Sequence, residues 1–205
     1  MGFFGEIFKD KKPGIAGELP ALHAVYSMLA EDKYWNIINE SQKVDGAQDR
    51  QLQFLKQKIS QLNPIEIIGF KLRTDYLLYQ SYTSEMWCAA HIMNGGCSDD
   101  GFEYFRNWII SQGKSAYYIA LNNPDDLIQF YDPSLEFYRF EELMYVALDV
   151  FLAKTNKNMY DYIDDAHFKT NEAHYPNLNF NWSEENKVQI KTLCPKLYDR
   201  FIGDF

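Results

Sequence analysis

Residues that could do chemistry gather in one short stretch of this chain, around a pair of glycines. Asn94 precedes Gly95-Gly96, and two carboxylates follow at Asp99 and Asp100. Consecutive carboxylates can supply oxygen ligands to a hard cation such as Mg²⁺, or act as a general acid and base. The same pair is also explained by a helix that begins here, because negative charge in the first turn complements the helix dipole. The helix-dipole interpretation is the simpler one, and the pair beside the glycine turn is still the best candidate for a site.

Two further side chains, on the helix that these aspartates would begin, complete the candidate binding set. Arg106 would neutralise an anionic substrate, or would pair with Glu103 one turn earlier. Trp108 would contribute an aromatic wall. No catalytic residue can be assigned from these residue types alone. The predicted ligand-binding residues are Asn94, Asp99, Asp100, Arg106 and Trp108.

A metal site built on cysteine and histidine is a second chemical hypothesis. Cys88 and His91 lie one helical turn apart, and Cys97 and Asp99 follow closely. The set does not have a recognised zinc-ligand spacing, and a buried free cysteine usually behaves as a small apolar residue. The structural interpretation is therefore favoured, and no metal is predicted.

A cysteine nucleophile is a third hypothesis. Cys97 lies near a predicted helix start, where the thiolate is favoured, and its base would be His91, His167 or His174. Nothing in the sequence brings one of these histidines to the thiol. The glycine turn is neither a P-loop nor a dinucleotide fingerprint, so no nucleotide or other cofactor is predicted.

Hydrophobic spacing predicts that helices position this stretch. Residues 52–62 carry leucine and isoleucine at helical intervals, and Asn63-Pro64 has the residue types of an N-cap and a first helical position. Ser98 is expected to cap the helix that carries the aspartates, and Gly95 suits a left-handed helix end. We predict an all-α fold, with a single compact domain of about eight to ten short helices.

The domain organisation follows from the placement of glycine and proline. Residues 1–30 form a predicted N-terminal leader that is partly helical, and residues 31–205 form the all-α domain. The phenylalanines and lysines of residues 1–12 allow peripheral membrane contact, although packing of the leader on its own domain is the simpler interpretation. Residues 141–154 are predicted as the last long helix, and residues 155–181 as a loop.

The glycine turn also carries a family resemblance. Residues 94–102 read NGGCSDDGF, and YFR, W and ISQG follow within residues 104–113. On these residues the chain resembles the bacterial proteins grouped as domain of unknown function 4240, over roughly residues 32–155. Cys88 and His91 stand where the family pattern leads us to expect a small residue and an aromatic one. The resemblance implies membership of the family but supplies no activity and no site residue.

Charge and composition exclude several classes of protein. The chain has 20 basic and 29 acidic residues, and no cluster of Lys or Arg that could neutralise nucleic-acid phosphates. No apolar stretch is long enough for a transmembrane helix, and the N-terminus lacks the features of a secretory signal. Three cysteines form an odd and sparse set, which favours a reducing, cytoplasmic compartment.

Acidic and aromatic residues gather toward the C-terminus. Residues 122–205 carry 15 acids and 8 bases, whereas residues 1–121 carry 14 acids and 12 bases. Aromatic residues make up 17% of the chain, and much of the tyrosine follows residue 121. Because tyrosine is enriched at binding hot spots, this composition predicts an acidic, tyrosine-bearing surface.

Two functional hypotheses follow. The first is a bacterial, cytoplasmic, non-catalytic module for protein interaction or regulation that binds a basic protein; a more specific version is an immunity-type protein that neutralises a basic toxin enzyme. The alternative is an enzyme or small-ligand binder at the Gly95-Gly96 turn that uses Asp99, Asp100 and Arg106.

Overall fold

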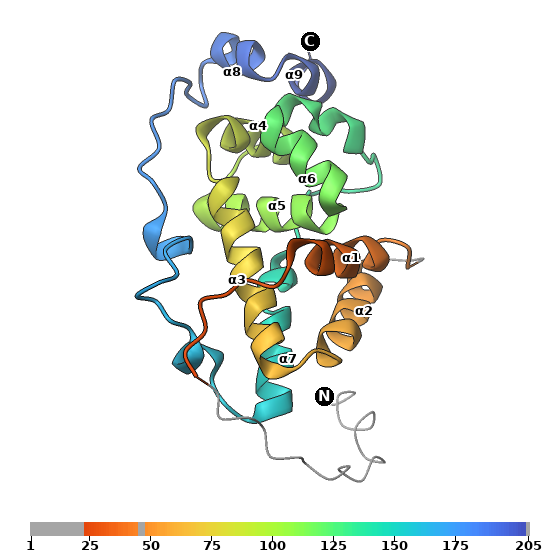
Figure 1. Cartoon of the computed structure of the whole chain (residues 1–205). Helices are drawn as coiled ribbons and strands as arrows, with labels where there is room; N and C mark the ends of the chain where they lie inside the picture. The colour runs from red at the N-terminus through yellow and green to blue at the C-terminus, as the bar shows by residue number, and fades with distance from the viewer. Residues whose placement is uncertain (1–22, 45–47, 204–205) are drawn as a thin grey trace, which may run out of the picture.

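A computed structural model of the chain describes residues 23–44 and 48–203. Within these residues the chain forms nine α-helices, with 3-10 helices between them and one isolated β-bridge but no strand, so the predicted all-α fold is confirmed (Figure 1). The α-helices are α1 (Glu31–Ser41), α2 (Gln48–Ser60), α3 (Pro64–Gln80), α4 (Ser84–Asn94), α5 (Asp99–Ser111), α6 (Gly113–Asn122), α7 (Val146–Thr155), α8 (Lys187–Leu193) and α9 (Pro195–Phe201). The 3-10 helices are η1 (Pro124–Phe130), η2 (Glu141–Met144), η3 (Met159–Tyr162) and η4 (Glu172–His174).

The helix ends near the candidate site follow from local side-chain chemistry. Asn63 and Glu66 form a reciprocal capping box at the start of α3, with Pro64 at the first position. The Ser98 hydroxyl accepts the Gly101 amide at 3.1 Å and begins α5, and Gly95 ends α4 with a φ of 67°. These three predicted boundaries are confirmed.

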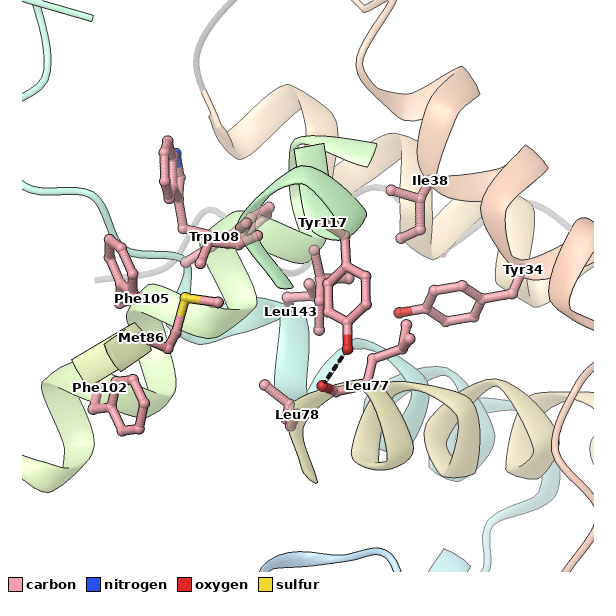
Figure 2. Packing of buried hydrophobic residues seen from close by; sticks show 14 of the residues in the cluster. Tyr34, Ile38, Leu77, Leu78, Met86, Phe102, Phe105, Trp108, Tyr117 and Leu143 are labelled. Atoms are coloured by element: carbon pink, nitrogen blue, oxygen red, sulfur yellow. Dashed lines mark hydrogen bonds between the residues drawn. The ribbon is translucent and has the colours of Figure 1, made fainter. Parts of the chain in front are cut away.

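The core surrounds α3, which is buried on several sides. Figure 2 shows the rings of Tyr34 of α1 and Tyr117 of α6 extending toward Leu77 in its C-terminal half. The Tyr117 hydroxyl of α6 donates to the Leu77 carbonyl oxygen at 2.7 Å, and the Tyr34 hydroxyl of α1 lies 3.0 Å from the Thr74 hydroxyl. Buried tyrosines therefore fill volume and also satisfy polar atoms inside the core.

The described part of the predicted leader packs on the domain as extended chain. Val25 forms a parallel bridge with Ile163, in which the Val25 amide donates to the Tyr162 carbonyl at 2.8 Å. The Leu29 amide donates to the Gly69 carbonyl of α3 at 2.8 Å. Residues 1–12, which allow peripheral membrane contact in the sequence analysis, lie outside the described residues.

The segment after α7 differs from the rest of the molecule. Residues 157–186, called the strap below, run beside α3 from the end of α7 to α8 with only the short turns η3 and η4 (Figure 1). The prediction of a loop in residues 155–181 is confirmed. The predicted helix over 141–154 is divided into η2 and α7. Leu143 and Val146, three residues apart, are both buried, and a 3-10 turn aligns residues at that interval.

Candidate functional site

A groove lies between the strap and the helices α3, α4 and α5, and it consists of three hollows. The first hollow, of about 300 Å³, lies between α3 and residues 160–175. The second, of about 320 Å³, lies at the start of α5 and shares Glu103, Glu172 and Tyr175 with the first. The third, of about 370 Å³, shares Trp87 with the second. Neighbouring hollows thus share wall residues, and the three are together called the groove below.

The predicted residues Asp99, Asp100 and Arg106 all line the second hollow. Both aspartates are exposed and occupy the first turn of α5, so they complement the helix dipole while their carboxylates also face the groove. The structural and functional interpretations of this pair are therefore compatible.

Arg106 is buried, with 2% of its surface exposed, and its contacts differ from those expected. The guanidinium donates to the Leu78 carbonyl at 2.6 Å and to the Tyr175 hydroxyl at 3.1 Å. The rings of Phe102, Tyr82 and Tyr175 surround it, with its central carbon 4.5, 5.0 and 5.0 Å from their centroids. Arg106 therefore joins α3, α5 and the strap, instead of forming the predicted ion pair with Glu103.

Asn94 and Trp108, the other two predicted residues, do not line the groove. The Asn94 side chain accepts the Tyr138 amide at 2.8 Å and donates to the Tyr138 carbonyl at 3.4 Å. Trp108 is 4% exposed and packs edge-on against the Tyr138 ring, with the ring centroids 4.9 Å apart. Both residues hold the loop before η2 against α4 and α5.

The first hollow contains buried charge that the sequence did not indicate as a site. Lys71 and Asp75 form an ion pair one turn apart on α3, with 12% and 14% of their side chains exposed. Burial raises the pKa of the Asp75 carboxyl although Lys71 opposes the shift. Burial also raises the pKa of Glu103, and the negative charge of Glu172 adds to both shifts. The negative charge of Glu172 thus adds to burial in disfavouring the ionised forms of Asp75 and Glu103.

Glu103→Gln is expected to stabilise the protein at pH 7. Because the pKa of Glu103 is raised above its ordinary value of 4.5, the native state holds this proton more tightly than the unfolded state. The stability that the carboxyl group contributes is therefore complete below pH 4.5 and is lost as pH rises through the native pKa. Urea unfolding should show a higher midpoint for the variant at pH 7 and no difference near pH 4. Glu136→Gln, at an exposed position, should not change the midpoint at pH 7. Equal midpoints for Glu103→Gln and the parent protein at pH 7 would contradict the prediction.

The cysteines have properties that oppose the nucleophile and metal hypotheses. Burial raises the pKa of Cys97 to about 12, so its thiol is protonated at neutral pH despite its place near a helix start. Cys88 and Cys194 are buried and lie against one another. Among the described residues, no group of three or more His, Cys, Asp or Glu side chains is arranged to hold a metal ion.

Cys97 is accordingly expected to react slowly with iodoacetamide in the native protein. Peptide-resolved mass spectrometry at pH 7 should show labelling at least ~100-fold slower than in concentrated urea, where burial no longer suppresses the thiolate. A native rate close to the rate in urea would mean that the thiol is activated, and would restore the nucleophile hypothesis.

Sequence reasoning missed the strap wall of the groove and the α3 charges. Glu172 and Tyr175 follow Arg106 by more than 60 residues, in a segment without periodicity. Lys71 and Asp75 have the spacing of an ordinary surface ion pair. One available signal was the position of Arg106 on the same helix face as Phe102 and Ile109, which indicates burial of the guanidinium.

Within the described residues no helix has the length and apolar character needed to cross a membrane. No curated protein and no solved structure matches the chain. One family model, described as "protein of unknown function (DUF4240)", matches residues 29–153. That range includes the α3, α4 and α5 walls of the groove and ends before the strap. The chain therefore belongs to the DUF4240 family.

Proposed function

We propose that the protein is an interaction module whose groove holds a basic segment of a partner protein. One observation carries this proposal. The groove has two basic side chains, Lys71 and Arg106, and both are already engaged, by Asp75 and by the Leu78 carbonyl with Tyr175. Among the described residues, the remaining carboxylates of the groove form no ion pair with a Lys or Arg side chain, and a histidine nitrogen lies 3.7 Å from the Glu184 carboxylate. They are Asp99, Asp100, Glu103, Asp165, Glu172, Glu184 and Glu185.

The walls between these carboxylates are aromatic. Tyr145 and Tyr160 line the first hollow with 43% and 56% of their surfaces exposed, and Tyr82 stacks on Tyr175 at 4.2 Å in the second. Aromatic faces attract Lys and Arg side chains and give large contact area with few rotatable bonds. A row of carboxylates separated by ring faces is thus complementary to a peptide with several cationic side chains.

Close carboxylates give this groove a reason to take up positive charge. The raised pKa values of Asp75 and Glu103 reflect burial and repulsion by Glu172, and a bound cation would relieve that repulsion. The tyrosine surface predicted after residue 121 contributes only one wall, because α3, α4 and α5 supply the other. An immunity-type protein that neutralises a basic toxin enzyme would use a groove of this kind.

The test is binding of a fluorescein-labelled nona-arginine peptide to the full-length chain, followed by fluorescence anisotropy. The groove variant carries Asp99→Asn, Glu103→Gln and Glu172→Gln. The matched control carries Asp49→Asn, Glu136→Gln and Glu142→Gln, which change the net charge equally at exposed positions elsewhere. We expect the groove variant to weaken binding at least ~10-fold and the control less than ~3-fold at moderate salt. Equal weakening by both variants would overturn the proposal, since it would show attraction to net charge alone.

The alternative, a small-ligand site at the glycine turn, is supported by the shared wall position of Asp99, Asp100 and Arg106. The hydrogen bonds of Arg106 change the kind of ligand that is expected at this site. With the guanidinium engaged inside the protein, the exposed charge of the second hollow is negative, so this version also favours a cationic ligand over an anionic substrate.

A further inference from the structure

The third hollow differs from the other two in having two tryptophans in its wall, together with a phenylalanine. Trp87 comes from α4, and Phe180 and Trp182 come from the end of the strap. The Phe180 ring lies 5.6 Å from Trp87 at an interplanar angle of 80°, and 5.7 Å from Trp182 at 73°. Both indoles therefore stand steeply against the phenyl ring, which forms the wall between them.

Hydrogen bonding and packing fix the two indoles and use their N–H groups. The Trp182 indole nitrogen donates to the carbonyl and hydroxyl oxygens of Ser84 at 3.0 and 3.1 Å. The Trp87 indole nitrogen donates to the Cys97 carbonyl at 3.4 Å, and its ring packs on Phe102 at 4.4 Å. The indole N–H groups are therefore engaged inside the protein, and the hollow has indole carbon atoms in its wall but no free indole donor. Phe180 is 48% exposed and leaves the hollow open on its side.

The charge around this hollow is negative. Glu184 and Glu185 belong to its wall, and no Lys or Arg among the described residues does. The Nδ1 atom of His91 lies 3.7 Å from the Glu184 carboxylate, and the His91 ring lies 5.7 Å from that of Trp182. The aromatic rings and carboxylates of this wall attract positive charge, and the wall has no free indole N–H donor. The hollow therefore favours a cation that does not need hydrogen bonds.

We propose that the third hollow binds a methylated ammonium group, carried by a small quaternary amine or by a methylated lysine side chain. Such a cation is weakly hydrated and is attracted by ring faces and by carboxylates at short range. A primary ammonium or a guanidinium would lose hydrogen bonds to water that these ring faces do not replace. The third hollow belongs to the proposed groove and shares Trp87 with the second hollow, but its test is separate, because choline binding does not require a peptide in the rest of the groove.

Choline and its neutral carbon isostere 3,3-dimethylbutan-1-ol are the first pair of probes. Binding to the full-length chain is followed by isothermal titration calorimetry and by tryptophan fluorescence, since Trp87 and Trp182 both belong to the site. We expect choline to bind at least ~10-fold more tightly than the isostere, because only choline carries the charge that the rings and carboxylates attract. Equal affinity for choline and the isostere would overturn the proposal. So would the absence of binding by both choline and the methylated peptide described below.

Variants locate the binding. Phe180→Leu keeps an apolar side chain but removes the ring face, and should weaken choline binding ~10-fold. The pair Glu184→Gln and Glu185→Gln should weaken it ~5-fold and reduce its salt dependence. Phe137→Leu is the matched control, because Phe137 is similarly exposed at 43% and lies outside the three hollows. Loss of affinity in Phe137→Leu equal to that in Phe180→Leu would place the site elsewhere.

A second pair of probes distinguishes the sources of the methylated group. A short peptide with one trimethyllysine is compared with the same peptide carrying unmodified lysine. Binding of choline and of the methylated peptide alike supports a site for the group itself, and preference for the methylated peptide over choline indicates a protein ligand. Equal binding of the two peptides would show attraction to charge without recognition of methylation, and would overturn the inference. The Asp99, Glu103 and Glu172 variant should leave choline binding unchanged, which separates this test from that of the proposed function.

Discussion

Arg106→Met is expected to lower the free energy of unfolding by about 2–4 kcal/mol. Methionine would fill much of the volume but would leave the Leu78 carbonyl and the Tyr175 hydroxyl without their donor. Three ring contacts to the guanidinium would also be lost. The free energy of unfolding of Arg106→Lys should lie between those of the parent and Arg106→Met. An ammonium keeps the charge but lacks the planar guanidinium that donates to two elements at once. Urea titration followed by circular dichroism measures all three proteins.

The matched control for this prediction is Arg139→Met. Arg139 is exposed, and its guanidinium also lies over a ring, 5.1 Å from the centroid of Phe137. Its replacement should change the free energy of unfolding by less than about 0.5 kcal/mol, since water can replace its contacts. Similar losses for Arg106→Met and Arg139→Met would show that burial of the guanidinium contributes little to the fold.

Gly69→Ala should destabilise the protein by about 2–4 kcal/mol, although alanine is the better helix former. A Cβ atom at position 69 would lie 2.8 Å from the Leu29 backbone nitrogen and 3.2 Å from the Ser27 carbonyl oxygen. Both are main-chain atoms, so relief requires the whole extended segment before α1 to move. That movement would break the bond from the Leu29 amide to the Gly69 carbonyl and strain the bond from Arg73 Nε to the Leu29 carbonyl.

Gly101→Ala provides the control, because Gly101 is also helical and has no positive φ. A Cβ atom there would meet the Ser98 hydroxyl at 3.2 Å, which is a side-chain atom that can shift by a few tenths of an ångström. We expect the free energy of unfolding of Gly101→Ala to lie within about 1 kcal/mol of that of the parent, because the better helix propensity of alanine and the crowding at Ser98 oppose one another. Thermal unfolding of both variants compares them directly, and a Gly69→Ala protein as stable as Gly101→Ala would exclude close packing of residues 27–29 on α3.

Elements whose chemistry is local could be predicted from the sequence. The Asn63 capping box, the Ser98 cap and the Gly95 helix end each depend on residues within one turn, and the structure has all three. The helical class followed from apolar spacing in the same way. The family resemblance, carried by residues 94–113 and their flanks, is confirmed by the match over residues 29–153.

The groove could not be predicted as a whole, because its two walls are far apart in the sequence. Asp99, Asp100 and Arg106 come from one helix and line the same hollow, but Tyr175 and Glu172 come from a segment whose position depends on tertiary contacts. Arg106 and Glu103 have the spacing of a surface pair. The aromatic residues that bury Arg106 come partly from that same distant segment. The spacing of residues along one helix carries no information about such contacts. For this reason it predicted an ion pair with Glu103, whereas the structure has Arg106 bonded to Leu78 and Tyr175.

The contacts that hold the strap join residues that are far apart along the chain. Arg106 and Tyr175 are separated by 69 residues, and Ser84 and Trp182 by 98. Closing loops of this length lowers chain entropy before the new contacts provide stabilisation, whereas the turns between α3, α4, α5 and α6 close short loops. The helical body is therefore expected to form first during folding, and the strap to dock late. The groove is then the last part of the molecule to be assembled, so variants that loosen the strap should accelerate unfolding more than they slow refolding.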